Sequence, residues 1–455
     1  MFTLNNAFAG IVGSKRRVLK LLPVVCLSML LCAAPPQTFA YGGGGGGDTG
    51  GGKSKRTQKT KKAPAMTEKV YKKLTEAQEL IEANKYNEGL AILRELEHKK
   101  KLSPYEKAQI YNYFAYTYFT MEKYKEAIRS YEKVLQQPDL PEALQANSLY
   151  TLAQLFFIQE NYKRAVETIK KWFAITPKPT ENAYMLLGQG YYQLEKYKES
   201  LVPLKTAYKL VKSRGVKPRE SLLLLLRVDY FNLGDYKNMI KVLKELVELY
   251  PKTEYWLTMA GAYSEMKQLK KQMSIFEMLY ERGELTRGNQ QLNLANLYLL
   301  HDVPYKAAKV LDKGMKKGII KKEIRNLRLL SQSWLQAQES KKSIPPLKLA
   351  AKLSKDGDLD VRLAQAYINL DNYTDAVAAL KSGLKKGRLK RKDQAYVMLG
   401  MAQLELKHYN SSIGAFNNAK EYKRSKKTAL QWIKFVQSEK NRDQQLAASL
   451  SRRRR

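Results

Sequence analysis

The chain has 455 residues, of which 44% are hydrophobic and 27% charged, and its formal net charge at pH 7 is +38. This length suffices for two or three compact domains or for one elongated array of repeats, and the composition is typical of a soluble protein with ample core material. Both cysteines, Cys26 and Cys32, lie within the first forty residues. Without that segment the chain has no thiol, which excludes disulfide bonds, cysteine nucleophiles and thiolate metal sites.

Residues 1–40 have the features of an export signal. Lys15, Arg16 and Arg17 precede an apolar run over residues 21–34, and Thr38-Phe39-Ala40 follows as a small-residue cleavage site. A membrane-spanning helix needs about 20 apolar residues, so a cleaved signal peptide is predicted, with an inner-membrane anchor facing the periplasm as the alternative. The mature protein is then expected in the periplasm.

Residues 41–65 are predicted to form a flexible linker rich in glycine and lysine. The stretch GDTGGGKS at residues 47–54 matches the pattern of a phosphate-binding loop. Such a loop needs a buried strand before it and a helix that begins at its lysine. Here nine glycines lie between Gly42 and Gly52, and a polar segment follows that ends near Pro64. The linker interpretation is therefore favoured, and no nucleotide cofactor is expected.

From about Val70 onward one unit recurs at intervals of about 33 to 39 residues, the period of a helical solenoid. Its second half opens with motifs such as KYNEGL, KYKEAI, NYKRAV and NYTDAV. Within one unit, Tyr184, Leu187 and Tyr191 follow helical spacing, and Leu201 and Leu204 do so again after a short polar turn. Each unit is therefore predicted to be a helical hairpin. The second residues of the ten motifs are Tyr86, Tyr124, Tyr162, Tyr197, Tyr236, Leu269, Tyr305, Lys341 or its neighbour, Tyr373 and Tyr409.

The stretch NAYMLLGQGYYQLEKYKESLVPL, residues 182–204, resembles the tetratricopeptide repeat. The resemblance covers about ten units, up to Asn418, and implies an all-α, right-handed α-solenoid over residues 66–420. A helix over residues 421–440 is expected to cap the last hydrophobic face, because terminal repeats need a covered end. Residues 441–455 are expected to form a basic tail, which ends in four arginines.

Small residues recur in pairs where the two helices of a hairpin are expected to cross. The pattern is broken at Arg227 with Met239 and at Gln272, and the eighth unit carries two prolines at residues 345–346. An irregular solenoid is therefore expected around residues 227–272. The regular pairs are Ala77 with Gly89, Ala115 with Ala127, Ala153 with Ala165, Gly188 with Ser200, Ala295 with Ala308, Ser331 with Ser343, Ala364 with Ala376, and Gly400 with Ser412.

No constellation of catalytic or metal-binding residues is found. The three histidines, His98, His301 and His408, are each more than a hundred residues apart, and none has the i, i+4 partner of a helical zinc site. A non-catalytic protein without metal, cofactor or small-molecule substrate is predicted.

The resemblance implies a concave groove lined by the first helices, rich here in amides and aromatic rings. Amides both donate and accept hydrogen bonds, so they can hold the backbone of an extended peptide while rings receive its side chains. A scaffold or adaptor for a protein or peptide segment is therefore predicted, the alternative being a solvent-facing polar stripe. The expected groove residues are Asn112, Tyr116, Phe119, Tyr150, Gln154, Phe157, Asn182, Gln189 and Tyr192, and the set continues with Asn296, Gln332, Gln336, Gln365 and Asn369.

Basic residues cluster at the turns between hairpins and are expected to form one basic edge. This edge could contact an anionic lipid, lipopolysaccharide, peptidoglycan or acidic-protein surface, or could simply be solvated. Nucleic acid is not an expected partner of an exported protein. The proposed contacts are Lys316, Lys317, Lys321, Lys322, Lys385, Lys386, Arg388 and Arg391.

The order of signal, linker, about ten units and basic end is also similar to that of the tetratricopeptide proteins accompanying TonB/ExbB/ExbD energy-transduction systems. The resemblance is one of layout, without a specific motif. It implies an adaptor of the cell envelope, with adaptors of peptidoglycan synthesis or outer-membrane assembly as alternatives.

Overall fold

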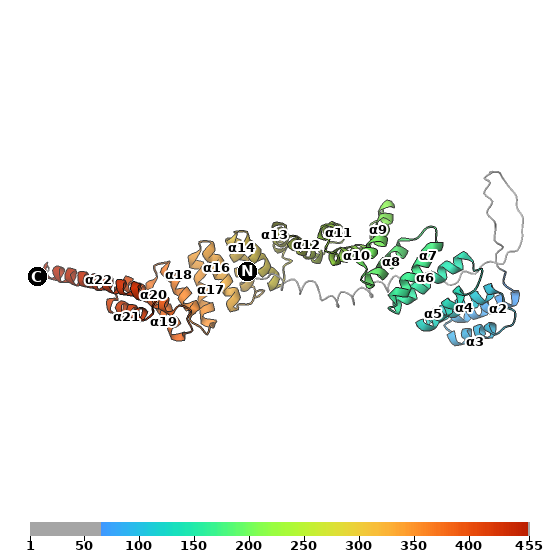
Figure 1. Ribbon diagram of the computed structural model, residues 1–455, viewed down its shortest axis with the longest axis horizontal. Helices are drawn as coiled ribbons and strands as arrows, with labels where there is room; N and C mark the ends of the chain where they lie inside the picture. Colours follow the sequence, from blue (N-terminus) through green and yellow to red (C-terminus); the bar gives the residue numbers. More distant parts are fainter. Residues whose placement is uncertain (1–64, 454–455) are drawn as a thin grey trace. The chain divides into compact units, whose positions relative to one another are not determined.

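The computed structural model describes residues 65–453, which fold into 21 helices and contain no strand (Figure 1). The prediction of an all-α fold is confirmed. The expected export signal and nearly all of the expected linker lie outside the described residues. Among the described helices, none combines the length and the apolar content needed to cross a bilayer.

The helices pair into ten consecutive hairpins followed by one long helix, as the repeat predicted. The chain divides into two compact units, one up to Thr258 and one from Met259, with the boundary inside α12. The first-unit hairpins are α2 (Glu68–Glu82) with α3 (Tyr86–Glu97), α4 (Pro104–Thr120) with α5 (Tyr124–Leu135), α6 (Glu142–Ile158) with α7 (Tyr162–Ile175), α8 (Glu181–Gln193) with α9 (Tyr197–Ser213), and α10 (Glu220–Asn232) with α11 (Tyr236–Leu249). Next come α12 (Thr253–Glu265) with α13 (Leu269–Glu281), α14 (Gly288–Leu300) with α15 (Pro304–Lys316), α16 (Ile324–Gln336) with α17 (Ser340–Leu353), α18 (Asp358–Ile368) with α19 (Tyr373–Lys386), α20 (Lys392–Glu405) with α21 (Tyr409–Lys420), and finally α22 (Lys426–Arg453).

Every hairpin turn has the same backbone conformation. Two residues before each second helix begins, one residue has a positive φ, which reverses the chain within three residues. Only one of these positions is glycine, so the turn tolerates a conformation that side chains usually disfavour. The residues are Asn84, Glu122, Glu160, Glu195, Gly234, Lys267, Asp302, Gln338, Asp371 and Lys407.

The recurring tyrosine at the start of the second helix closes the hairpin. In four hairpins its ring packs against an aromatic ring five residues earlier, at the end of the first helix. The ring centroids are 6.2 Å apart for Phe119 and Tyr124, 5.2 Å for Phe157 and Tyr162, 5.8 Å for Tyr192 and Tyr197, and 6.4 Å for Phe231 and Tyr236. These contacts account for the tyrosine in those four hairpins.

The predicted small-residue pairs lie at the helix crossings. All of them are buried. Where serine pairs with glycine, it also bonds across the crossing: Ser200 Oγ donates to the Gly188 carbonyl at 2.8 Å, whereas Ser343 Oγ donates within its own helix to the Ser340 carbonyl. First helices of successive hairpins also touch each other directly, α2 with α4 and α8 with α10 in the first unit, and α18 with α20 in the second. The first helices therefore form the inner face of each unit.

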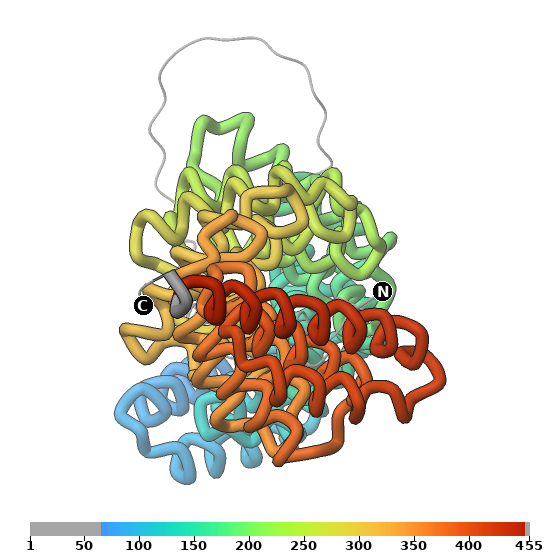
Figure 2. The backbone as a smooth tube through the Cα atoms, turned by 90° about the vertical axis from the view of Figure 1, so that its left-hand side faces the viewer, coloured from blue at the N-terminus to red at the C-terminus, as the bar shows by residue number. Residues whose placement is uncertain are grey.

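The last helix covers the end of the second unit. α22 packs along α21 (Figure 2), where the Trp432 ring stacks on Phe416 with centroids 5.7 Å apart, and Ala429 and Val436 are buried. The helix is longer than the segment expected over residues 421–440, because it continues to Arg453. Most of the segment expected to be a basic tail is thus helical.

Candidate functional site

The inner face of the second unit contains a hollow of about 310 Å³ between α16 and α18, called here the groove pocket. Four of the amides predicted from sequence belong to this face, and three of them line the hollow. The lining residues are Arg328, Ser331, Gln332 and Leu335 of α16, Leu347 of α17, Arg362, Gln365 and Ala366 of α18, and Asn369, which caps α18.

Helical spacing explains why these side chains come together. Residues 328, 332 and 336 follow each other at intervals of four along α16, and residues 362, 365 and 369 follow at intervals of three and four along α18. Side chains at these intervals lie on one face of a helix. The groove pocket is therefore bordered by two polar rows, one from each of two successive first helices.

Arg328 and Arg362 give the groove pocket its charge. Both side chains are exposed, and neither has a carboxylate within ion-pair distance among the described residues. A guanidinium group presents several donors in a planar fork that matches a carboxylate. The two cations are thus available to a ligand rather than used within the fold.

The amides and the floor complete the pocket. Gln365 Nε2 donates to Asn369 Oδ1 at 2.9 Å, so the two amides hold each other in place. Gln332 is exposed, Leu347 is buried beneath the hollow, and Leu335 is 36% exposed. Such a surface can accept the polar backbone of a peptide above a small apolar floor and can bind a carboxylate at its edge.

In the first unit, the aromatic part of the predicted groove is used inside the fold. Phe119, Phe157 and Tyr192 pack against the tyrosine that closes their own hairpin. Tyr150 packs against Trp172, with ring centroids 5.3 Å apart. Burial also raises the pKa of Tyr192 to about 12. All four rings thus stabilise hairpins. Tyr192 is buried, which corrects its placement in the groove, whereas Phe119, Phe157 and Tyr150 are half-buried and their place in the groove stays a prediction.

The predicted groove amides of the first unit differ in their exposure. Gln189 is buried and belongs to the interior of α8, which corrects its placement in the groove. Asn112, Gln154 and Tyr116 are half-buried, and Asn182 is exposed. Asn296, expected to continue the set, is exposed on α14 of the second unit.

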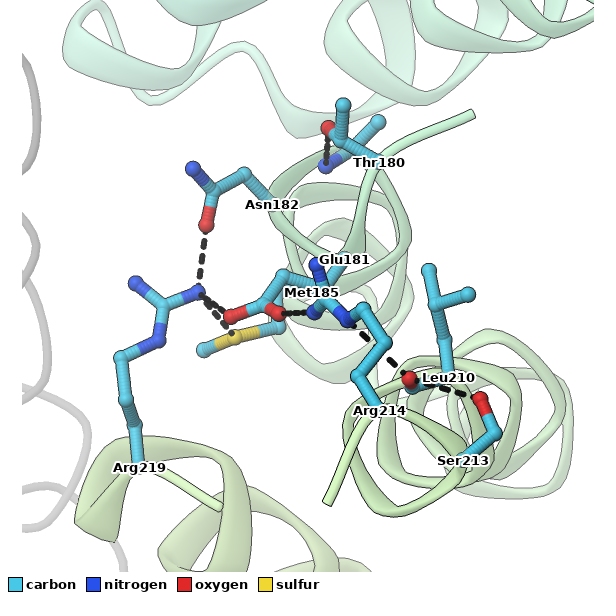
Figure 3. Close-up of polar contacts among 9 residues, drawn as sticks. Thr180, Glu181, Asn182, Met185, Leu210, Ser213, Arg214 and Arg219 are labelled. Atoms are coloured by element: carbon cyan, nitrogen blue, oxygen red, sulfur yellow. Dashed lines mark hydrogen bonds and ion pairs between the residues drawn. The ribbon is translucent and has the colours of Figure 1, made fainter. Parts of the chain in front are cut away.

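Asn182 takes part in a polar network with Arg219, a residue that the sequence analysis did not identify (Figure 3). The Arg219 guanidinium donates to Asn182 Oδ1 and to Glu181 Oε1, the latter at 2.7 Å, and lies 3.4 Å from Met185 Sδ. Arg214 pairs with the other oxygen of Glu181. The network ties the start of α8 to the residue before α10, so Asn182 supports the fold at this point.

The predicted basic edge is only partly available for contacts. Lys386 donates to the Ala351 carbonyl at 2.7 Å and to Asp360 Oδ2 at 2.8 Å, and Arg391 binds Asp393 through two nitrogens at 3.0 Å. These two residues hold turns together, but Arg391 is exposed and Lys386 is half-buried, so their assignment as surface contacts stays a prediction. The other six are exposed: Lys316, Lys317, Lys321, Lys322, Lys385 and Arg388.

A buried acidic side chain distinguishes the irregular hairpin of the first unit. Asp229 of α10 is fully buried, and neither of its carboxylate oxygens accepts a hydrogen bond of good geometry among the described residues, because the nearby Ser200 hydroxyl donates to the Gly188 carbonyl. Burial raises its pKa to about 7. Two positions earlier, Arg227 occupies a helix-crossing position where other hairpins have a small residue, and burial lowers its pKa. This pair marks the point where the repeat pattern breaks.

The described residues contain no cluster of three or more histidine, cysteine, aspartate or glutamate side chains that could hold a metal ion. His408 precedes α21 in a hairpin turn, and His301 ends α14, with a buried Nε2 that has no partner among the described residues.

Three family models match parts of the chain. An RNPP family C-terminal domain matches residues 75–209, and two tetratricopeptide-repeat models match residues 230–253 and 361–425. The chain therefore carries tetratricopeptide repeats in both units, and its fold is a solenoid of such hairpins. A search of curated proteins gives no match.

Several solved structures are similar over part of the chain. MamA from Desulfovibrio magneticus shares 18% identity over 38% of this chain and 94% of its own, with a TM-score of 0.32. YrrB, described as a tetratricopeptide protein with an unusual peptide-binding site, shares 12% identity over 42% and 96%, with a TM-score of 0.33. A tetratricopeptide-repeat protein from Parabacteroides merdae shares 15% identity over 58% and 100%, with a TM-score of 0.32.

Proposed function

We propose that this chain of tetratricopeptide hairpins is a non-catalytic adaptor that holds a segment of a partner protein in the groove pocket. The observation that carries the proposal is the pair of unpaired arginines, Arg328 and Arg362, beside three amides on one inner face. Concave surfaces of helical solenoids generally serve as extended binding surfaces. The family matches support the same class of function.

The groove pocket favours a ligand with a carboxylate next to peptide backbone. Two guanidinium groups without an internal carboxylate leave a local excess of positive charge, which an acidic side chain or a chain terminus would neutralise. The amides of Gln332, Gln365 and Asn369 can meet backbone N–H and C=O groups of either polarity. A volume of about 310 Å³ limits the deeply inserted part to a few side chains.

The proposed setting is the periplasm, where the adaptor would serve a cell-envelope assembly. The support is the signal-like sequence of residues 1–40 and the absence of cysteine after residue 40. An accessory role in TonB-type energy transduction is one such setting, supported by the layout of the sequence alone. N-terminal sequencing of the protein from an envelope fraction tests the location: a chain starting at Tyr41 supports export, and a cytoplasmic chain with residues 1–40 attached contradicts it.

Panning of a phage-displayed random peptide library against the full chain tests the binding function. The proposal expects enrichment of peptides with a conserved acidic residue or a free terminal carboxylate. The enrichment should be lost with the double substitution Arg328→Glu/Arg362→Glu. It should persist with Lys348→Glu/Lys381→Glu, which changes the net charge equally at exposed positions of the second helices.

An identical peptide set on the wild type and on the arginine variant would contradict the proposal, because the ligand would then bind elsewhere. Loss of enrichment with both double variants would also contradict it, because a general charge effect would then explain the binding.

A further inference from the structure

A second and larger cleft of the second unit lies at α13, α15 and α17. Its volume is about 1000 Å³, and it is called here the lysine cleft. It shares no lining residue with the groove pocket. Its lining consists of Tyr280 and Glu281 of α13, Tyr298 of α14, Tyr305, Lys306, Lys309, Val310, Asp312, Lys313 and Lys316 of α15, Lys317 at the end of α15, Leu330 and Trp334 of α16, and Lys342, Pro345 and Pro346 of α17.

The floor of the lysine cleft is aromatic. Tyr298 and Trp334 come from first helices and are almost completely buried, with 3% and 6% of their surface exposed. Tyr305 stands against Trp334 edge to face, with ring centroids 5.6 Å apart, and is 44% exposed. Pro345 and Pro346 continue the apolar wall. Since prolines lack the N–H of a helix interior, their position within α17 is unfavourable for the helix alone.

The rim of the lysine cleft is a row of cations along α15. Lys306, Lys309, Lys313 and Lys316 follow each other at intervals of three and four, so they lie on one helix face over roughly 15 Å. Several of these ammonium groups stand over the rings of the floor. Lys309 Nζ is 5.6 Å from the centre of the Tyr305 ring, Lys313 Nζ is 5.8 Å from that of Tyr280, and Lys342 Nζ is 5.0 Å from that of Trp334.

The positive charge of the lysine cleft exceeds what the fold neutralises. Glu277 binds Lys306 at 2.5 Å, Asp312 binds Lys316 at 2.7 Å, and Glu339 binds Lys342 at 3.0 Å. The described residues provide no carboxylate within ion-pair distance of the three remaining lysines, which are Lys309, Lys313 and Lys317.

We propose that the lysine cleft binds an extended acidic segment of a partner protein, with its carboxylates at the lysines and its apolar side chains on the aromatic floor. Same-face side chains of an extended chain lie roughly 6.6 Å apart, close to the roughly 5.4 Å between successive turns of α15. Acidic residues at alternate positions of the segment would therefore meet successive lysines.

The shape and the chemistry of the cleft favour a peptide over other anions. A flat bilayer would reach the lysines at the rim but not the recessed rings of Tyr298 and Trp334. The lining contains no arginine among its described residues, and its lysines are spread along a helix instead of converging on one point, as a single phosphate would require. A slender chain with charges at intervals uses both the rim and the floor.

Fluorescence anisotropy with a labelled peptide of alternating glutamate and apolar residues, Glu-Tyr-Glu-Leu-Glu-Tyr-Glu, tests the proposal on the full chain. The substitution Lys309→Glu/Lys313→Glu should weaken binding by roughly tenfold or more. Tyr305→Ser should weaken it as well, because this exposed ring supplies part of the floor. Lys348→Glu/Lys381→Glu is the matched charge control and should leave the affinity within about twofold.

Three results would overturn the proposal. The first is equal affinity of the wild type and the Lys309→Glu/Lys313→Glu variant, and the second is equal affinity for the peptide with glutamine in place of glutamate. The third is a wild type that binds phosphatidylglycerol vesicles but not the peptide, together with loss of vesicle binding in the Lys309→Glu/Lys313→Glu variant. The last result would assign the lysines to a membrane surface. Peptide binding that survives Arg328→Glu/Arg362→Glu but not Lys309→Glu/Lys313→Glu would separate this site from the groove pocket, so the two proposals can fail independently.

Discussion

The Ser412 hydroxyl donates a hydrogen bond to the Gly400 carbonyl at 2.7 Å, across the point where α21 crosses α20. The same bond joins Ser200 and Gly188 at 2.8 Å in the first unit. The distance leaves no room for a larger residue: a Cβ on Gly400 would lie 2.7 Å from Cζ of Phe416, which is fully buried. Close helix crossings of this kind set the geometry of the hairpin.

Gly400→Ala should therefore destabilise the second unit. The added methyl group must displace the Phe416 ring, which is stacked on Trp432, and such overpacking costs about 1–3 kcal/mol. Gly414→Ala is the matched control, because a Cβ at Gly414 meets nothing within 4 Å and alanine favours the helix. Urea unfolding measures the unfolding free energy of both variants. Equal unfolding free energies for the two variants would show that the crossing is not tightly packed.

Asp229→Asn should reduce the pH dependence of the first unit's stability. The folded protein keeps a proton on Asp229 up to about pH 7, whereas the unfolded chain loses it near pH 4. The unfolding free energy should therefore fall as the pH rises from about 4 to about 7, by up to about 4 kcal/mol. The unfolding free energy of Asp229→Asn should change less with pH over this range, and it should exceed that of the wild type at about pH 8.

Melting temperatures between about pH 5 and pH 8 check this prediction. Glu199→Gln, at an exposed position of α9, serves as the control and should keep the wild-type slope. A wild-type melting temperature that stays constant or rises over the range would mean that Asp229 is ionised in the folded protein.

Truncation should show which part of α22 caps the solenoid. A chain that ends after residue 425 loses Trp432 and Val436 and uncovers Phe416, so the second unit should melt at a lower temperature. A chain that ends after residue 444 keeps these residues and Asp443, which accepts hydrogen bonds from Lys407 and Tyr409, and should melt like the full chain. Scanning calorimetry distinguishes the two. Identical melting of both truncated chains would argue against a capping role.

Arg391→Ala should destabilise the turn before α20 rather than weaken binding to an anionic surface. Arg391 and the Ser425 hydroxyl, which donates at 2.9 Å, hold the pKa of the buried Asp393 well below its usual range. Asp393 therefore contributes stability above about pH 4, and this contribution is lost as the pH falls further. The variant should melt at a lower temperature than Lys390→Ala at neutral pH. Equal melting temperatures of the two variants would mean that Arg391 does not stabilise the turn.

The sequence allowed the hairpins to be predicted well because their signals are local. The interval between tyrosines and the small-residue pairs both follow from helix geometry, and both are found in the structure. The role of the aromatic rings was not predictable in the same way. Phe119 and Tyr124 meet because Glu122, in the turn between them, adopts a positive φ. The repeat pattern does not predict which residue of the turn adopts the positive φ.

The groove pocket illustrates the opposite case, in which a signal was present but incomplete. Residue type alone points to the amides Gln332 and Gln365, whereas Arg328 and Arg362 lie in the same helical rows without such a signal. Their importance depends on the lack of a carboxylate partner, which is a property of the three-dimensional neighbourhood. The same holds for Lys316 and Lys317, which were expected to lie on a basic edge and prove to border a cleft with an aromatic floor.

Site-specific photo-crosslinking in cells tests the central claim most directly. A photoreactive residue at Gln365, in the groove pocket, should capture a defined partner protein. The capture should disappear when Arg328→Glu/Arg362→Glu is added and persist with Lys348→Glu/Lys381→Glu. The same crosslinker at Lys381, on a second helix, should not capture this partner. Capture at Lys381 alone, or capture at Gln365 that survives reversal of both arginines, would contradict the assignment of the groove pocket as the binding site.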